Sequence, residues 1–262
     1  MDQTAHLLAA YDDQLRTDAE TTGALAVRVL GPLHLATFAG GRGFVTYRDL
    51  GGAGPTTIGA LVAEALDHLV RDPAVTRVEW KTRGHDQAPG LHDALLEHGF
   101  RPEEPESIMV GAAELLAVDV TLPVGATLRR VSTEADVRAA SAVQDLAFGD
   151  PVSDERAGDL LRRLDLDDEL ELWVAEVEGR VVSAGRLEPV PGSEFAGLWG
   201  GATLAGWRGR GLYRALTAAR ARSALRRGQT LLHSDSTASS RPILERAGLV
   251  RVSTTTPYQW RR

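Results

Sequence analysis

The sequence predicts an α/β protein of two domains, each with a central mixed β-sheet flanked by helices. Three observations support this prediction. Strand-like and helix-like segments alternate along both halves of the 262-residue chain. A glycine-rich turn joins a strand to a helix at residues 208–213. A short helical motif that ends in glycine, residues 95–100, recurs at residues 243–249, which indicates an internal repeat.

In the first half, apolar residues recur at the spacing of strands and amphipathic helices. Gly99 follows the second expected helix, as is typical of a helix end. The expected elements are strands at residues 24–35 and 43–47, a helix at 57–70, a strand at 75–80, a helix at 91–98 and a strand at 107–110.

In the second half, Ser132 and Thr133 offer capping oxygens for a first helix, and Glu178-Gly179-Arg180 forms the turn of a hairpin. Gly248 closes a short helix near the end. The expected order is a strand from residue 126, helices from 134 and around 160–164, strands at 172–177, 181–187 and 198–204, a helix from 212, a strand at 230–235, a helix at 240–249 and a strand at 258–260.

The turn at residues 208–213 has the features of a binding site for a phosphate-bearing ligand. Gly209 and Gly211 let the backbone turn tightly and direct N–H groups toward one point. The following helix adds its free N-terminal donors and the positive end of its dipole. Seven Arg and no acidic residue lie between residues 195 and 234 of a chain whose net charge is −7. A basic segment in an acidic protein indicates an anion site.

This loop resembles the acetyl-CoA pyrophosphate loop of the GCN5-related N-acetyltransferase (GNAT) family, whose pattern is Arg/Gln-x-x-Gly-x-Gly/Ala. Arg208 and Gly211 match the first two defined positions, and Tyr213 departs from the third. The order of elements is also that of the GNAT fold, so the resemblance covers about residues 126–262. The plain alternative is a strand-to-helix turn without a ligand.

The resemblance implies acetyl-CoA as co-substrate. Its pyrophosphate would bind the loop amides, helped by the side chains of Arg208 and Arg210, and its pantetheine would run along the preceding strand, where that strand and residues 231–235 splay apart. A backbone amide there would polarise the thioester carbonyl. The cofactor-binding candidates are Ala202, Thr203, Leu204, Arg208, Gly209, Arg210, Gly211, Leu212, Tyr213 and Ser239.

The sequence leaves open which residues act as general acid and general base. Many family members use a tyrosine as general acid where this sequence has Leu244. His233 and Glu194 are candidate bases, and Tyr258 is a candidate acid, because each ends or flanks a strand near the expected site. The alternatives are a partly buried structural histidine, a solvated turn acid and a packed aromatic residue. The reaction can also proceed with water as the proton donor.

The first half is expected to be a degenerate GNAT-like domain that does not hold CoA. Its corresponding loop has no arginine, Asp49 would repel an anion, and Pro55 lacks an N–H donor. We expect domains at residues 1–122 and 126–262, with the seam near Pro123 and Gly125. An unrelated α/β lobe and one continuous domain are the alternatives.

The composition excludes several classes of function. The absence of Cys excludes disulfides and a cysteine nucleophile. The acidic net charge argues against nucleic-acid binding, and no apolar run or signal-like start is present, so we expect a cytoplasmic protein without a membrane partner. His85, His92 and His98 do not have metal-site spacing, and no metal is expected.

The predicted function is therefore acetyl-CoA-dependent N-acetylation of a small-molecule or peptide amine by direct attack in a ternary complex. A non-catalytic acyl-CoA binding or sensor protein is the alternative, suggested by the missing tyrosine. A homodimer is compatible with the sequence, and the acceptor itself has no recognisable signature.

Overall fold

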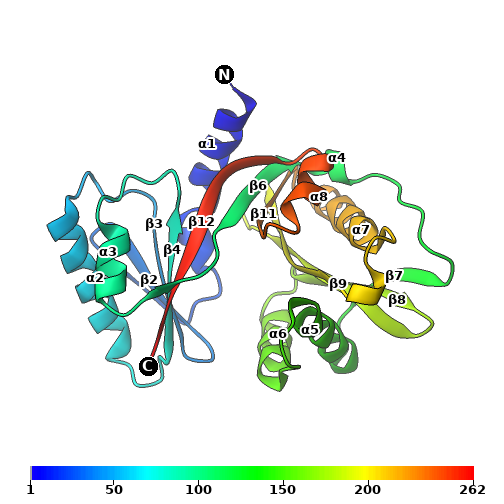
Figure 1. The fold of residues 1–262 in the computed structure, drawn as a ribbon, viewed down its shortest axis with the longest axis horizontal. Helices are drawn as coiled ribbons and strands as arrows, with labels where there is room; N and C mark the ends of the chain where they lie inside the picture. Colours follow the sequence, from blue (N-terminus) through cyan, green and yellow to red (C-terminus); the bar gives the residue numbers. More distant parts are fainter. Residues whose placement is uncertain (1) are drawn as a thin grey trace. The chain divides into compact units, whose positions relative to one another are not determined.

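The computed structural model describes residues 2–262 and divides them into two compact units (Figure 1). The N-terminal unit contains the residues up to 108 together with residues 235–238 and 251–262. The C-terminal unit contains residues 109–234 and 239–250. Both units have strands flanked by helices, and the predicted mixed α/β class is confirmed.

The N-terminal unit places three helices and a 3-10 turn around its strands. Its elements are α1 (Gln3–Leu15), η1 (Thr17–Thr21), β1 (Ala26–Leu30), β2 (Leu33–Phe38), β3 (Arg42–Tyr47), α2 (Pro55–Val70), β4 (Arg77–Arg83), α3 (Leu91–Glu97), β5 (Arg101–Pro102), the start of β6 (Glu106–Ala112) and most of β12 (Val250–Arg261).

The strands of this unit follow the order β1-β2-β3-β4-β12. Every neighbouring pair is antiparallel except β3 and β4, which pair in parallel. The helices α2 and α3 bury their apolar faces on this sheet, with Ile58, Leu69, Trp80 and Leu95 each almost wholly buried in one cluster. Burying large apolar side chains in this way stabilises the unit.

Strand β12 differs from the expectation that the end of the chain belongs to the C-terminal domain. It pairs with β4 from Thr255–Arg83 to Arg261–Arg77, and it also pairs with β5. The apolar pattern of residues 258–260 predicts a strand, but a local pattern does not identify the neighbouring strand.

The C-terminal unit begins with the rest of β6 and contains the glycine loop. Its further elements are α4 (Ala113–Leu116), β7 (Ala126–Val131), α5 (Glu134–Phe148), α6 (Asp154–Leu166), β8 (Glu171–Val177), β9 (Arg180–Pro189), β10 (Phe195–Thr203), η2 (Ala205–Trp207), α7 (Leu212–Arg226), β11 (Leu231–Ser236) and α8 (Arg241–Arg246).

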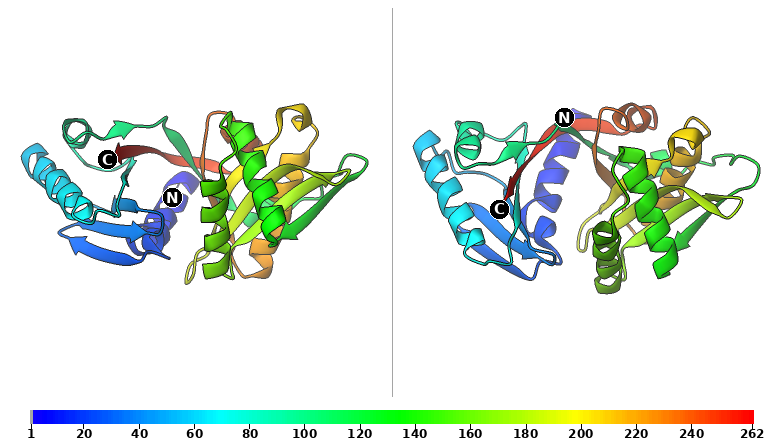
Figure 2. Two further views of the ribbon diagram at one scale, coloured as in Figure 1. Left: turned by 90° about the horizontal axis from the view of Figure 1, so that it is seen from below. Right: turned by 60° about the horizontal axis from the view of Figure 1, so that its bottom comes forward.

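The strands of this unit follow the order β6-β11-β10-β9-β8-β7. Strands β10 and β11 pair in parallel, whereas β7, β8, β9 and β10 form an antiparallel meander. The helices α5 and α6 lie on one face of this sheet and α7 lies on the other (Figure 2). The two faces of β10 therefore have different surroundings.

Helix α1 and helix α4 have no counterpart in the elements expected from the sequence. Asp2 caps the start of helix α1, because its side chain accepts a hydrogen bond from the Thr4 N–H, and the helix buries Leu7, Tyr11 and Leu15. This spacing of four residues puts the three side chains on one face. In the chain from residue 2 onward, no helix is both long and apolar enough to span a membrane.

Candidate active site

The site begins where strands β10 and β11 separate. Their parallel pairing runs only from Phe195–Leu231 to Gly197–His233, although β10 continues to Thr203 and β11 to Ser236. The predicted splaying of these two strands in the C-terminal unit is confirmed. Beyond Gly197, one edge of β10 is free of β11 and can pair with an extended ligand.

A bulge follows directly after this point of separation. The pairing of β10 with β9 shifts register between Trp199 and Ala202, so that Gly200 and Gly201 stand outside the regular ladder. Gly200 has φ +58°, and its carbonyl accepts a hydrogen bond from Gln144 Nε2 at 2.7 Å. A Cβ on Gly201 would lie 2.8 Å from Cε2 of Tyr213. Only glycine fits both positions without displacing a neighbour.

At the end of β10, the backbone groups of Thr203 face the free edge of the strand. Leu204 donates its N–H to Val182 of β9, and alternate residues of an antiparallel pair direct their backbone groups to opposite sides. Thr203 therefore directs its N–H and carbonyl toward the free edge, where the carbonyl accepts from Arg208 Nε at 3.1 Å. Of the three expected pantetheine-binding residues at 202–204, only Thr203 directs its backbone groups toward the free edge, because Leu204 and Ala202 face β9.

The glycine loop leads into α7 with its backbone donors exposed. Gly209 and Gly211 both have positive φ, +73° and +81°, which glycine adopts without strain. The first bond of the helix runs from the Ala215 N–H to the Gly211 carbonyl. The N–H groups of Leu212, Tyr213 and Arg214 consequently have no acceptor inside the helix. These donors and the helix dipole form an anion site.

The arginine side chains of this region have several different roles. Arg208 donates to the carbonyls of Thr203 and Ala147, so it anchors the loop to β10 and α5 instead of extending toward a phosphate, which differs from the expectation. The Arg210 guanidinium stacks on Trp207, 4.7 Å from the ring centroid. Arg220 is buried, and Arg227 pairs with Glu169 and Glu171.

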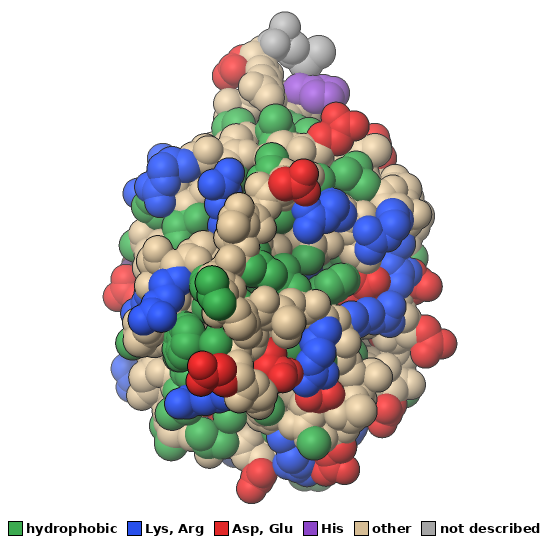
Figure 3. All heavy atoms as spheres, turned by 90° about the vertical axis from the view of Figure 1, so that its right-hand side faces the viewer, with side chains coloured by type: hydrophobic (Ala, Val, Ile, Leu, Met, Phe, Trp, Pro, Cys, Tyr) green, Lys and Arg blue, Asp and Glu red, His purple; other side chains and the backbone are tan. Residues whose placement is uncertain are grey.

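The predicted basic segment is therefore not a single surface patch. On the face drawn in Figure 3, Lys and Arg side chains lie interspersed with Asp and Glu. The backbone donors at the start of α7 are the more specific feature for an anion, because they converge on one point.

A hollow of about 280 Å³ lies beside the bulge, on the face of the sheet that α5 and α6 cover and α7 does not. Gly200 forms part of its wall, and α5 and α6 supply most of the rest. Asp145 is buried there and pairs with Arg156 at 2.7 Å. The lining of the hollow combines apolar, polar and charged residues: Ser141, Gln144, Asp145, Phe148, Asp150, Arg156, Asp159, Leu160, Arg163, Arg186 and Gly200.

Two arginines of this hollow share one carboxylate. Glu188 contacts Arg163 Nη2 at 2.7 Å and Arg186 Nε at 2.9 Å. Burial raises the pKa of Glu188, but the two guanidinium groups outweigh it and hold the pKa below its ordinary value. Glu188 is therefore ionised at neutral pH, and this trio carries a net positive charge.

His233 lies at the last pair between β10 and β11, close to the bulge. Its ring is 8% exposed and lies edge-on to Trp199 and Phe195, with centroids 5.4 Å and 5.9 Å away. The structure thus places His233 beside the point where β10 and β11 separate.

Glu194 lies far from the bulge. It is an exposed residue that precedes β10, and Thr230 Oγ1 is 3.4 Å from its carboxylate. The bulge begins five residues later, roughly 17 Å along a strand. A direct role in catalysis would require a large movement, so the structure does not bring Glu194 to the site.

Tyr258 belongs to the N-terminal unit and not to the unit that contains the loop. Its hydroxyl lies 2.7 Å from Nδ1 of His92, and its ring is part of the buried core. Burial raises the pKa of its phenol, and Asp93 adds to this. Its placement on β12 explains the difference from the expected role as acid.

Leu244 and Ser239 lie close together in the chain but differ in exposure. Leu244, which occupies the position of the usual tyrosine, is buried in an apolar cluster with Leu198 and Leu232. Ser239 is exposed in the turn before α8. Within residues 2–262, no group of three or more His, Cys, Asp and Glu side chains is placed to hold a metal ion.

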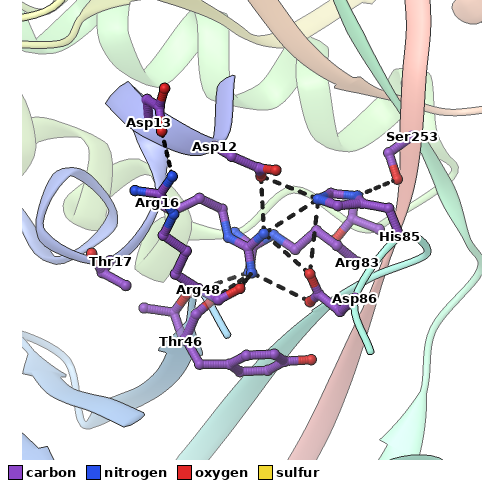
Figure 4. Close-up of polar contacts among 12 residues, drawn as sticks. Asp12, Asp13, Arg16, Thr17, Thr46, Arg48, Arg83, His85, Asp86 and Ser253 are labelled. Atoms are coloured by element: carbon purple, nitrogen blue, oxygen red, sulfur yellow. Dashed lines mark hydrogen bonds and ion pairs between the residues drawn. The ribbon is translucent and has the colours of Figure 1, made fainter. Parts of the chain in front are cut away.

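The corresponding region of the N-terminal unit is filled by its own side chains (Figure 4). Parallel pairing of β3 with β4 ends at Val45–Trp80, so these strands also separate. Arg16, which follows α1, donates to the carbonyls of Tyr47 and Arg48 at the end of β3 and pairs with Asp86 at 3.2 Å. The Arg16 guanidinium thus bridges the two strand ends.

A second set of charges extends this network. Arg83 pairs with Glu20, whose carboxylate also accepts from Thr46 Oγ1 at 2.6 Å. Burial raises the pKa of Glu20, but Arg83 and Lys81 outweigh it and lower the pKa overall. Asp235 pairs with Lys81 at 2.8 Å, so this carboxylate is engaged in the N-terminal unit. No local sequence signal predicts this network, because its members are far apart in the chain.

The splayed strands, the bulge and the open helix start lie together in the C-terminal unit. Residues 139–248 match the family model described as the Acetyltransferase (GNAT) family. This match supports a transferase, and the matched family uses acetyl-CoA as co-substrate.

Solved structures show the same fold at low sequence identity. A GCN5-related N-acetyltransferase from Kribbella flavida is 17% identical, with TM-score 0.68, over 99% of this chain and 96% of that chain. A tandem GNAT protein from the clavulanic acid biosynthesis pathway is 15% identical, with TM-score 0.64, over 99% and 96%. No curated protein gives a sequence match.

A third similar structure is a GCN5-related N-acetyltransferase from Sphaerobacter thermophilus. It is 18% identical to this chain, with TM-score 0.62, and the match covers 88% of this chain and 76% of that one. At these identities the likeness concerns the fold, and the predicted family resemblance is confirmed by the matched domain.

Proposed function

We propose that the C-terminal unit transfers an acetyl group from acetyl-CoA to the amine of a small molecule or peptide by direct attack in a ternary complex. The observation that carries this proposal is the separation of β10 from β11 immediately before the open start of α7. This arrangement offers an extended edge for pantetheine and an anion site for pyrophosphate on one continuous path.

The backbone supplies most of the binding groups in this proposal. The N–H groups of Leu212, Tyr213 and Arg214 bind the pyrophosphate, and the Thr203 N–H binds a pantetheine carbonyl. A backbone N–H of the bulge faces the thioester carbonyl and stabilises the oxyanion that forms on attack. These donors act through geometry and do not depend on side-chain ionisation.

The amine acceptor approaches from the hollow beside Gly200. The hollow lies between α5, α6 and β10, on the face of the sheet opposite α7. We assign His233 as the base that takes the amine proton, directly or through water, because it lies beside the point where β10 and β11 separate. Asp and Arg side chains in the hollow suit a polar acceptor.

The N-terminal unit is a degenerate copy of this domain that does not bind acetyl-CoA. The strand β3, the helix α2 and the parallel strand β4 repeat the arrangement of β10, α7 and β11. Arg16 bridges the ends of β3 and β4, and Pro55 begins α2 without a backbone donor. Both features argue against a second CoA site and favour a tandem arrangement.

Amine-dependent release of CoA tests the proposal against the alternative of a non-catalytic acyl-CoA binder. The chain has no Cys, so a thiol reagent added to the reaction detects only CoA. We expect thiol release from acetyl-CoA in the presence of an amine from a panel of amino acids, polyamines, amino sugars and peptides. Tight binding of acetyl-CoA without release for any amine would favour the binder.

A further inference from the structure

Gly200 and Gly201 present the bulge of β10 to two different environments. A Cβ on Gly200 would meet Gln144 and Arg186 at 2.4 Å and 2.8 Å, on the side of the hollow. A Cβ on Gly201 would meet Tyr213, at 2.8 Å from Cε2 and 3.4 Å from the hydroxyl oxygen. The phenol of Tyr213 thus covers the face of the bulge that is opposite the hollow.

Tyr213 is held there by the first turns of α7. It is the second residue of the helix, and the Thr217 hydroxyl donates to its carbonyl at 2.9 Å. Burial raises the pKa of the Tyr213 phenol, while the charge of Arg220 and the hydroxyl of Thr217 act in the opposite direction. The phenol is therefore protonated at neutral pH and can donate a hydrogen bond.

Arg220 is a buried cation without an acidic partner in the described part of the chain. Its side chain is 1% exposed, and it donates to the carbonyls of Leu216 and Arg186 and to Thr217 Oγ1, at 3.3, 3.0 and 3.3 Å. Buried charges are normally paired, because an isolated charge is costly in an apolar interior. An anion that forms nearby would be stabilised by Arg220.

Acetyl transfer forms such an anion when the carbon–sulfur bond breaks. The amine nitrogen bonds to the carbonyl carbon, and the electron pair of the C–S bond moves to sulfur. Nitrogen and sulfur are attached to the same tetrahedral carbon and point in different directions. If the amine enters from the hollow beside Gly200, the sulfur departs on the side of Gly201 and Tyr213.

We infer that Tyr213 is the catalytic residue that protonates the CoA sulfur, and that Arg220 is a positioning residue that stabilises the phenolate left behind. The inference rests on the proposed acetyl transfer. The phenol proton moves to sulfur and completes the CoA thiol, and the phenolate regains a proton from water. The amine proton leaves through the base, so the reaction releases one amide and one thiol.

Tyr213→Phe tests this role, because it keeps the ring on Gly201 and removes only the hydroxyl. We expect kcat for amine-dependent CoA release to fall by about 10–100-fold, with the KM for acetyl-CoA and the melting temperature nearly unchanged. Tyr258→Phe is the matched control, since its hydroxyl contacts His92 in the N-terminal unit. We expect this control to retain the wild-type kcat.

A difluorotyrosine at position 213 separates proton donation from packing. It retains the ring and the hydroxyl but makes the phenol more acidic, so kcat changes only if the phenol takes part in proton transfer. Arg220→Met in the Tyr213→Phe background should add little to the loss, because the two residues act together.

The outcomes distinguish the inference from the proposed function. An active wild type whose Tyr213→Phe variant keeps full kcat overturns the inference and leaves the acetyl transfer intact. The same holds if the difluorotyrosine has no effect. A wild type that binds acetyl-CoA but transfers acetyl to no amine overturns the proposed function, and the role of Tyr213 with it.

Discussion

Residues 200 and 201 are glycines in the bulge of β10, where the proposed reaction places the thioester. Gly201→Ala would place a methyl group 2.8 Å from the Tyr213 ring, so the ring must move away from the bulge. Displacements of this kind cost about 1–3 kcal/mol in a packed site. We predict that Gly201→Ala lowers kcat for CoA release by about tenfold or more, measured with a thiol reagent.

Gly206→Ala provides the matched control for this substitution. A Cβ there has nothing within 4 Å, and the residue lies in η2 close to the same loop. We expect its kcat to equal that of the wild type. Equal losses in both variants would mean that general perturbation of the loop, and not contact with Tyr213, lowers the rate.

Glu106 should make stability depend on pH. Burial raises its pKa from 4.5 to about 7, and the nearby charge of Asp235 adds to this. Between these values the folded protein holds a proton that the unfolded chain has released, so the free energy of unfolding falls as pH rises. With an allowance for partial exposure, we expect Glu106→Gln to be about 1–2 kcal/mol more stable than the wild type at pH 8.

Chemical denaturation at pH 4 and pH 8 measures this effect. At pH 4 the carboxyl is protonated in both states, so wild type and Glu106→Gln should have similar stability. The exposed neighbour Glu104 supplies the control, and Glu104→Gln should show no such dependence on pH. A gain for Glu106→Gln that is the same at both pH values would contradict a titrating Glu106.

Individual site residues could be predicted from the sequence only where their backbone groups, and not their side chains, form the candidate site. Gly209, Gly211 and the start of the following helix could be predicted because their geometry follows from local residue types. The roles of Arg208 and Tyr258 could not, since they depend on distant partners such as the Ala147 carbonyl and His92. Tyr213 stood out in the sequence only as a departure from the family pattern.

At the scale of elements, the C-terminal unit depends on residues that precede the expected domain boundary. Met109, Ala113 and Leu116 are fully or nearly buried in its core, and Leu122 packs against a second cluster beside α7. A chain of residues 126–262 loses all four. Each lost large side chain costs about 2–5 kcal/mol, so we predict that this fragment does not unfold cooperatively.

The fragment of residues 109–262 is the control, because it restores these contacts while still lacking the first 108 residues. We expect it to be more soluble and more stable than residues 126–262, as measured by circular dichroism during thermal unfolding. Equal behaviour of the two fragments would show that β6 and α4 contribute little to the unit.

The positions of helices and strands could be predicted where apolar spacing and turn residues mark them in the local sequence. The α2, α7 and β10 segments appear near their expected positions because apolar spacing and glycine turns define them. Helix α1 has a usable signal, the Leu7, Tyr11 and Leu15 stripe behind an Asp2 cap, which the sequence analysis did not use. The partner of β12 has no local signal, because strand pairing is decided by contacts across the fold.

At the scale of the whole molecule, the two units contain related strand and helix arrangements but differ in what fills the separation of their parallel strands. Arg16 bridges β3 and β4 in the N-terminal unit. In the C-terminal unit the equivalent strands lead to the open start of α7. We therefore predict one acetyl-CoA site per chain.

Calorimetric titration of the full chain with acetyl-CoA measures the number of sites. We predict one molecule bound per chain and no binding to Gly211→Glu, whose carboxylate would oppose the pyrophosphate. Gly52→Glu is the matched control, with the same substitution at a positive φ of +70° in the N-terminal loop, and should bind normally. Two sites per chain, or binding that survives in Gly211→Glu, would contradict the account.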